Sequence, residues 1–226
     1  MTPADVSSAI ARAVGVRDVP LSCLGPGTYG SPVALRLGLD VEGVAERVRT
    51  EPGILGVETS GGFLTVSVGV AETVQGVLRA GDAYGVAEVP HGGWHDRPRT
   101  FENPGFRVRY AYARACSVGR RARDLGVSRG AAEGLGAEEL LVVGVLGDLP
   151  GRASQAGREG HASALVKCLE RLADAFHGAY ERCPALPKGD EKPGAVHGAR
   201  VTLAEAARIA LGNGLKMIGE TPRERI

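Results

Sequence analysis

The sequence predicts an α+β fold, in which a small N-terminal α+β domain precedes an all-α helical bundle. Two strand-like segments, 54–59 and 63–68, flank Ser60-Gly61-Gly62, a typical hairpin turn. Residues 85–100 are rich in Gly and Pro, which indicates a linker or loop. Beyond them the apolar residues recur at helical spacing to the end of the chain. We therefore expect domains at 1–88 and 101–226, joined by a linker at 89–100.

The remaining N-terminal segments are short. Residues 3–14 predict an amphipathic helix because Val6, Ile10 and Ala13 fall on one side. Residues 41–49 predict another helix, with Val44 and Val48 facing inward. Three segments complete the domain: a Gly- and Pro-rich loop at 24–30, a strand or short helix at 33–38, and a helix at 71–80 that closes the unit.

Four helices are expected in the C-terminal domain. The first has a clear beginning and end, since Asn103 is a good N-cap, Pro104 suits the first helical position, and Gly126 is a typical stop. The other three are expected at 137–147, 162–180 and 203–218. Helices with modest loops between them make a bundle.

The overall charge is nearly balanced, at a formal net +1, but it is unevenly distributed. Residues 1–90 carry 6 basic and 10 acidic side chains, whereas 91–226 carry 21 and 16. From Arg97 to Arg129 there are 9 arginines against Glu102 and Asp124. Such a block favours a polyanionic partner for one face of the molecule. The alternative is a solvated helix face without a ligand.

The cysteines and the N-terminus indicate a cytoplasmic protein. The 4 cysteines include no C-x-x-C pair, so we expect reduced thiols. The N-terminus alternates polar and apolar residues rather than forming a signal peptide, and no apolar run is long enough to span a membrane.

Motifs for other chemistries are present only in unsuitable contexts. Gly25 to Gly30 fits G-x-G-x-x-G, but no good strand precedes it and Pro32 follows where a helix would have to begin. His91 and His95 are four apart, but Gly92-Gly93 disfavours the helix that would bring them together. Spacing alone leaves a hydrolase open, because catalytic groups meet in space, yet no G-x-S-x-G is present. We expect no catalytic residue, metal or cofactor.

The helix that begins at Pro104 carries the most informative pattern. Arg107, Tyr110, Arg114, Ser117 and Arg121 are spaced 3, 4, 3 and 4 apart, which places them in one stripe. Guanidinium groups can bind phosphates, and an aromatic ring can stack on a splayed base. The alternative is a helix whose tyrosine is part of the core and whose arginines are only solvated.

Three blocks of the C-terminal domain form extended motifs: residues 103–118, which read NPGFRVRYAYARACSV, residues 172–184 and residues 211–219. Together they resemble the DALR anticodon-binding domain of arginyl-tRNA synthetases. The first block is similar to the family's N-P-x-F-Y-V-Q-Y-A-H-A-R-x-C-S-[IV]. Residues 172–184 resemble its L-A-x-A-F-[HN]-x-F-Y-E-x-C-P. Residues 211–219 resemble its L-x-N-G-L-x-L-L-G, and the chain ends shortly afterwards at Ile226, where Met is usual.

The N-terminal region resembles the additional domain of the same family. Residues 27–37 are similar to G-D-Y-A-T-N-x-A-L-x-L, although Thr28 and Pro32 replace the usual Asp and Asn. Gly62-Phe63-Leu64 is similar to its later G-[FY]-[LI]. The resemblance implies contacts with the D-loop corner of tRNA from Gly27, Thr28 and Tyr29.

The resemblance as a whole implies tRNA binding without aminoacylation. It places Arg107, Tyr110 and Arg114 against the anticodon loop with the end of the chain at Ile226, and Ser117 and Arg121 continue the same stripe. The expected partner is tRNA, with arginine tRNA as the first candidate. Both ATP signatures of the family, His-Ile-Gly-His and Lys-Met-Ser-Lys, are absent. The alternative is an interaction or regulatory subunit that docks on a synthetase or another enzyme.

Overall fold

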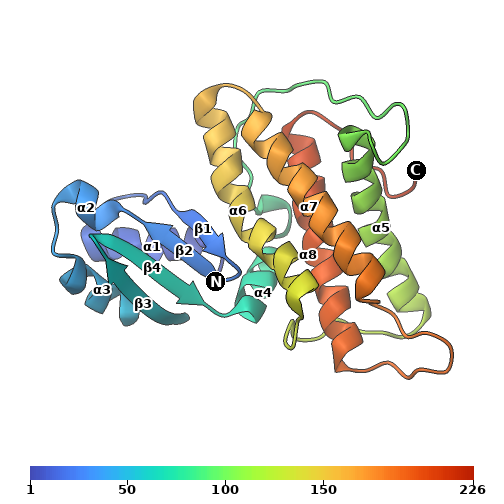
Figure 1. The fold of residues 1–226 in the computed structure, drawn as a ribbon, viewed down its shortest axis with the longest axis horizontal. Helices are drawn as coiled ribbons and strands as arrows, with labels where there is room; N and C mark the ends of the chain where they lie inside the picture. The colour runs from blue at the N-terminus through green and yellow to red at the C-terminus, as the bar shows by residue number, and fades with distance from the viewer.

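The computed structural model describes all residues from 1 to 226 and has a small mixed unit beside a helical bundle (Figure 1). This arrangement confirms the predicted fold class. The N-terminal elements are α1 Pro3–Val14, β1 Ser22–Gly25, β2 Thr28–Ser31, α2 Val33–Leu37, α3 Val41–Arg49, β3 Ile54–Ser60, β4 Phe63–Val68, α4 Val70–Ala80 and the 3-10 turn η1 Gly81–Ala83. The bundle consists of α5 Pro104–Asp124, α6 Ala137–Glu159, α7 Ser163–Arg182 and α8 Ala195–Met217.

The N-terminal sheet is antiparallel in the order β1-β2-β4-β3. Its β3–β4 hairpin confirms the predicted one, and Gly61 and Gly62 both have positive φ in the turn. Leu64, Val66 and Val68 alternate along β4 and face the core, where they join buried residues of α1 and α3. One sheet face is therefore covered by helices, as the alternation requires.

The predicted loop at 24–30 is wrong in part, because it contains the β1–β2 hairpin. Its Pro26-Gly27 turn depends on glycine: Gly27 has φ +67°, and a Cβ there would lie 2.5 Å from the Val68 carbonyl oxygen. The Val68 amide also donates to the Gly27 carbonyl at 2.8 Å. Pairing with β4 thus makes a strand from a segment that has little strand propensity of its own.

The four bundle helices share one continuous core. Both α5 and α6 pack against α7 and α8, so α5 and α6 occupy opposite corners (Figure 1). Helix α4 packs on α6 and α8, and its buried Val74 and Val77 belong to the bundle core. The sequence predicts the helix but places it with the N-terminal domain, because an apolar stripe does not specify which neighbour covers it.

Helix α6 extends well beyond the predicted end at residue 147 and contains Pro150. Proline lacks the amide that would bond to the carbonyl four residues earlier, here that of Leu146. The buried Tyr84 hydroxyl donates to this Leu146 oxygen at 2.7 Å and replaces the missing bond. A partner more than 60 residues away therefore lets the helix continue.

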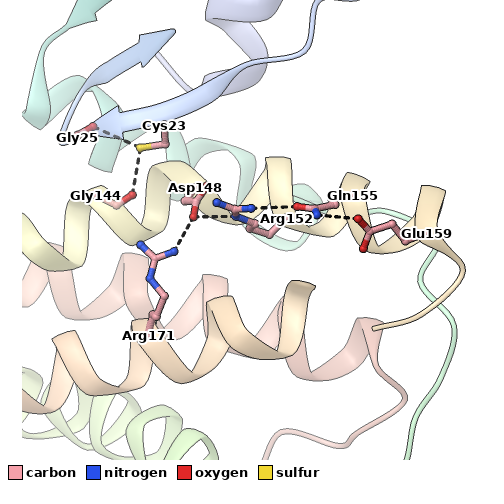
Figure 2. Close-up of polar contacts among 8 residues, drawn as sticks. All are labelled: Cys23, Gly25, Gly144, Asp148, Arg152, Gln155, Glu159 and Arg171. Carbon is pink, nitrogen blue, oxygen red and sulfur yellow. Dashed lines mark hydrogen bonds and ion pairs between the residues drawn. The ribbon is translucent and has the colours of Figure 1, made fainter. Parts of the chain in front are cut away.

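The N-terminal unit contacts the bundle directly at α6. Figure 2 shows the Cys23 thiol beside the Gly144 carbonyl oxygen, and the two are 3.3 Å apart. A Cβ at Gly147 would lie 2.9 Å from the Tyr29 hydroxyl and 3.3 Å from the Cys23 sulfur. The next turn holds Asp148, whose Oδ2 accepts from Arg152 Nε at 3.0 Å and Arg171 Nη1 at 2.8 Å (Figure 2). Small residues on α6 thus allow close approach of the sheet.

Candidate nucleic-acid interface

Helix α5 presents the predicted stripe and begins as the sequence indicates. The Asn103 side chain accepts from the backbone amides of Gly105 at 2.9 Å and Phe106 at 3.3 Å. The helix ends at Asp124, and Gly126 follows with φ +66°. This fixed start sets the rotation of the whole stripe, whose first half lies against α7.

An aromatic cluster surrounds Arg114 at the seam between α5 and α7. The rings of Phe106 and Tyr110 stack with centroids 5.6 Å apart and an interplanar angle of 10°. The Arg114 guanidinium carbon lies 4.7 Å from the Tyr110 centroid and 4.6 Å from that of Tyr180. Phe101, before the helix, meets Tyr110 edge-on at 5.5 Å. Arg114 therefore joins rings from two helices through cation–π contacts.

Polar contacts also hold Arg114. Its Nη1 lies 3.2 Å from Glu181 Oε1 and 3.2 Å from His177 Nδ1, and its side chain is only 18% exposed. These partners lie more than 60 residues away in the sequence, and the stripe alone gives no signal of them. The Arg114 guanidinium is thus a structural centre of the seam rather than a free cation.

His177 connects two residues of the stripe. Its Nε2 lies 3.1 Å from the Arg107 backbone carbonyl oxygen, while Nδ1 faces the Arg114 guanidinium. A carbonyl can only accept and a guanidinium can only donate, so the ring is neutral with its proton on Nε2. Burial lowers the pKa of His177, because desolvation penalises the charged ring.

Arg107 is likewise engaged within the protein. Its Nε lies 2.7 Å from Asp174 Oδ1 on α7, and its Nη1 donates to the Phe101 carbonyl at 3.0 Å. The second contact holds the segment before α5 over the seam. Arg107 and Arg114 both bridge to α7.

The arginine block therefore divides into two groups. Five of its members have a carboxylate within 4 Å: Arg99 with Asp96, Arg107 with Asp174, Arg109 with Glu220, Arg114 with Glu181, and Arg120 with Glu224. Four have no such ion pair: Arg97, Arg121, Arg123 and Arg129. Three of these four lie at or after the C-terminal half of α5, so the available positive charge gathers there.

A groove lies beside Arg121 at this end of the seam. It has a volume of about 500 Å³ and opens between the last turns of α5 and α7. Its walls include the apolar side chains of Val118 and Leu125, the Tyr180 ring, and the segment 184–188 that follows α7. We call the seam residues Phe101, Tyr110, Arg114, His177 and Tyr180, together with Arg121 and this groove, the α5–α7 face.

The other expected site residues are placed as follows. Ser117 is half-buried on the stripe, and Ile226 is 44% exposed at the end of a tail that Glu224 ties to Arg120. In the N-terminal unit, Gly27 forms the hairpin turn and Thr28 pairs with Ser67 of β4. Tyr29 is only 1% exposed and faces α6. The structure brings the α5 residues together, whereas it buries Gly27 and Tyr29 of the predicted D-loop contacts.

Residues 108–226, slightly more than half of the chain, match the family described as the DALR anticodon binding domain. The chain belongs to this family. It therefore has an anticodon-binding domain of the arginyl-tRNA synthetase type, which includes all four bundle helices apart from the first turn of α5. None of the helices in this DALR protein has the length and apolar character needed to cross a bilayer.

Relatives of this DALR protein are longer synthetases. An arginine–tRNA ligase of Clavibacter sepedonicus is 36% identical over 135 residues, which is 57% of this chain and 24% of that protein. An arginyl-tRNA synthetase structure from Thermus thermophilus has a TM-score of 0.46 and 24% identity, covering 56% of this chain and 22% of that one. The similarity thus spans about a quarter of each relative.

Proposed function

We propose that this DALR protein binds tRNA through the α5–α7 face and does not aminoacylate it. The observation that carries the proposal is the family match over 108–226, which includes nearly the whole of that face. Arginine tRNA is the first candidate, because the relatives are named as arginine ligases.

We propose different tasks for the stripe residues, according to their exposure and their contacts. The half-buried Tyr110 and the 45% exposed Phe101 offer ring surface for a splayed base. Arg121 is exposed on this face and has no ion pair, so it is the first proposed phosphate contact. Arg123 and Arg129 are also exposed without an ion pair, and they extend the positive charge from this end of α5 toward Glu205 of α8. Ser117 lies between these two regions, and Ile226 ends the tail near Arg120. Arg107 and Arg114 hold the face together instead of binding phosphates directly.

A D-loop contact from the N-terminal unit is the finer part of the proposal. Thr28 is its proposed contact, since Thr28 is half-exposed, whereas Gly27 is buried and its carbonyl accepts from the Val68 amide. Tyr29 is left out because α6 covers its ring.

The decisive measurement is tRNA affinity as a function of salt. If the face neutralises about three to five phosphates, the slope of log affinity against log salt should be near −2 to −4, since each phosphate contributes about −0.7 to −0.9. A slope near zero between 50 and 300 mM salt would reject an electrostatic interface.

Absence of aminoacylation has its own test. The sequence contains neither ATP signature of the family, and these signatures are the groups that would hold ATP and stabilise adenylate formation. ATP–pyrophosphate exchange with arginine and tRNA should remain at background. Exchange that scales with protein concentration would overturn this part of the proposal.

A protein-docking function is the second candidate, favoured by exposed apolar side chains on the N-terminal unit. Leu35, Leu37 and Leu39 lie on or beside α2, and Phe63 lies at the hairpin tip. Co-purifying nucleic acid separates the candidates: a high ratio of absorbance at 260 to 280 nm after low-salt purification supports tRNA binding. Protein free of nucleic acid that also fails to bind added tRNA supports docking.

A further inference from the structure

We propose that His177, as the neutral Nε2–H tautomer, is the positioning residue that sets Arg114 between its two tyrosine rings for RNA binding. This inference rests on the proposed function and adds a residue to it. His177 does not contact RNA itself, because its side chain is buried. It acts through Arg114, and consequently through Tyr110.

The contacts around the ring leave it one orientation. Nε2 donates to the Arg107 carbonyl, and Nδ1 accepts from Arg114 at 3.2 Å. Its faces and edges are packed by Phe101, with centroids 5.3 Å apart, and by Tyr110 at 5.8 Å. The acceptor atom Nδ1 therefore has a fixed position. Its hydrogen bond restricts the Arg114 side chain to one rotamer before RNA binds.

The charged groups around His177 come from both helices of the seam. On α5 they are the guanidiniums of Arg107 and Arg114, and on α7 the carboxylates of Asp174 and Glu181. If Nδ1 were protonated, its N–H would point at an N–H of the Arg114 guanidinium. Arg114 would then lose the hydrogen-bond acceptor that Nδ1 provides. It would retain only the exposed Glu181 and the ring faces, so its guanidinium would no longer be held in one position over Tyr110.

The sign of the resulting pH effect is distinctive. A histidine that meets phosphates directly binds RNA better when protonated, because it gains positive charge. His177 should act in the opposite direction, with affinity falling as the ring becomes charged. One proton linked to binding can reduce affinity by up to about tenfold per pH unit below its pKa.

The test compares two replacements at His177 near pH 7.5. In His177→Asn, the amide oxygen stands close to the position of Nδ1 and does not titrate, so tRNA affinity should stay within about twofold of the parent. His177→Leu keeps the volume but removes the acceptor, and affinity should fall about tenfold, the effect of losing one charge-assisted hydrogen bond. Equal losses in both variants would overturn the proposal.

The pH profile is the second readout. Between pH 8 and pH 4.5, parent affinity should fall below the pKa that NMR gives for the His177 ring. The affinity of His177→Asn measures the effect of every other group that titrates, including those of the RNA. It should change less with pH than the affinity of the parent protein. Parent affinity that rises through the NMR midpoint, or follows the asparagine variant, would contradict a role for the neutral ring.

A third readout does not depend on RNA. Nitrogen chemical shifts of free protein should show the Nε2–H tautomer, and Arg114→Ala should raise the His177 pKa, because a neighbouring positive charge is removed. An Nδ1–H tautomer would overturn the inference even if tRNA binds. Failure to bind tRNA at any pH, with the tautomer and the pKa change as expected, would reject the proposed function and the assigned role, and leave the His177–Arg114 contact established.

Discussion

At the residue scale, the presence of an arginine in a stripe and its availability to a ligand are separate properties. Arg107 and Arg121 share one face of α5, but only Arg107 has a carboxylate within reach. An arginine already paired with a carboxylate must break that contact to reach a phosphate, which reduces its net contribution. Binding energy should therefore come from Arg121 and its exposed neighbours.

Replacing Arg121 tests this division directly. Arg121→Ala should weaken tRNA binding and make the salt slope less steep by about one unit, because one phosphate contact is lost. Arg158→Ala is the matched control, since Arg158 is also exposed and without an ion pair but lies on α6 at the far corner of the bundle. Equal changes in the two variants would indicate only a net-charge effect.

Tyr110 is expected to contribute to binding in another way, by stacking. Tyr110→Ala should weaken binding by about 1–3 kcal/mol, the typical effect of losing a stacked base, with little change in salt slope. Tyr110 also stacks on Phe106 and Arg114, so the melting temperature must be measured beside the affinity. Phe63→Ala removes an exposed ring on the N-terminal unit and gives the comparison. A lower melting temperature with unchanged affinity would assign Tyr110 to packing alone.

At the element scale, local sequence signals predict where most helices and strands begin and end, but they rarely predict which elements pack together. The β3–β4 hairpin and the start of α5 follow from turn and cap residues that act within a few positions. The β1–β2 hairpin and the second half of α6 depend on β4 and on Tyr84, which are distant in sequence. Likewise, residue spacing predicts the α5 stripe. It does not predict the α7 residues that contact the stripe in the folded protein, which are Asp174, His177 and Glu181.

The pairing of Tyr84 with Pro150 has a measurable consequence. Tyr84→Phe should destabilise the protein by about 1–3 kcal/mol, because the Leu146 carbonyl is left buried without a donor. Pro150→Ala restores an amide that can bond to the same carbonyl, so the Tyr84→Phe change should cost less in that background. Unfolding of the four proteins in urea gives the coupling energy. Additive effects would show that the hydroxyl does not replace the missing amide.

At the scale of the whole molecule, the two units are joined through α6, on the side away from α5 (Figure 1). This arrangement leaves the α5–α7 face clear of the N-terminal unit. The same contact that buries Tyr29 therefore orients the sheet relative to the bundle. A ligand on the N-terminal unit would then be held in a fixed position relative to the α5–α7 face as long as the α6 interface stays closed.

Gly147 tests whether that interface is tightly packed. Glycine to alanine inside a helix ordinarily stabilises by up to about 1 kcal/mol. Gly119→Ala on α5 should show this gain, because nothing lies within 4 Å of its added Cβ. At Gly147, however, the new Cβ would lie 2.9 Å from the Tyr29 hydroxyl and 3.3 Å from the Cys23 sulfur, so the buried Tyr29 side chain, or the sheet that carries it, must shift. Gly147→Ala should therefore lower the melting temperature while Gly119→Ala raises it.

Thiol labelling of the Gly147→Ala variant tests whether the sheet separates from α6. Partial burial raises the pKa of the Cys23 thiol, so it should react slowly while the interface is closed. If the sheet separates from α6, Cys23 becomes solvated and alkylation at this position, followed by mass spectrometry, should accelerate. The deeply buried Cys168 of the bundle provides the internal reference, because it should remain protected while the helices stay folded. Alkylation of Cys23 at the parent rate, together with a stability gain equal to that of Gly119→Ala, would show that the two units do not depend on this contact to hold their relative position.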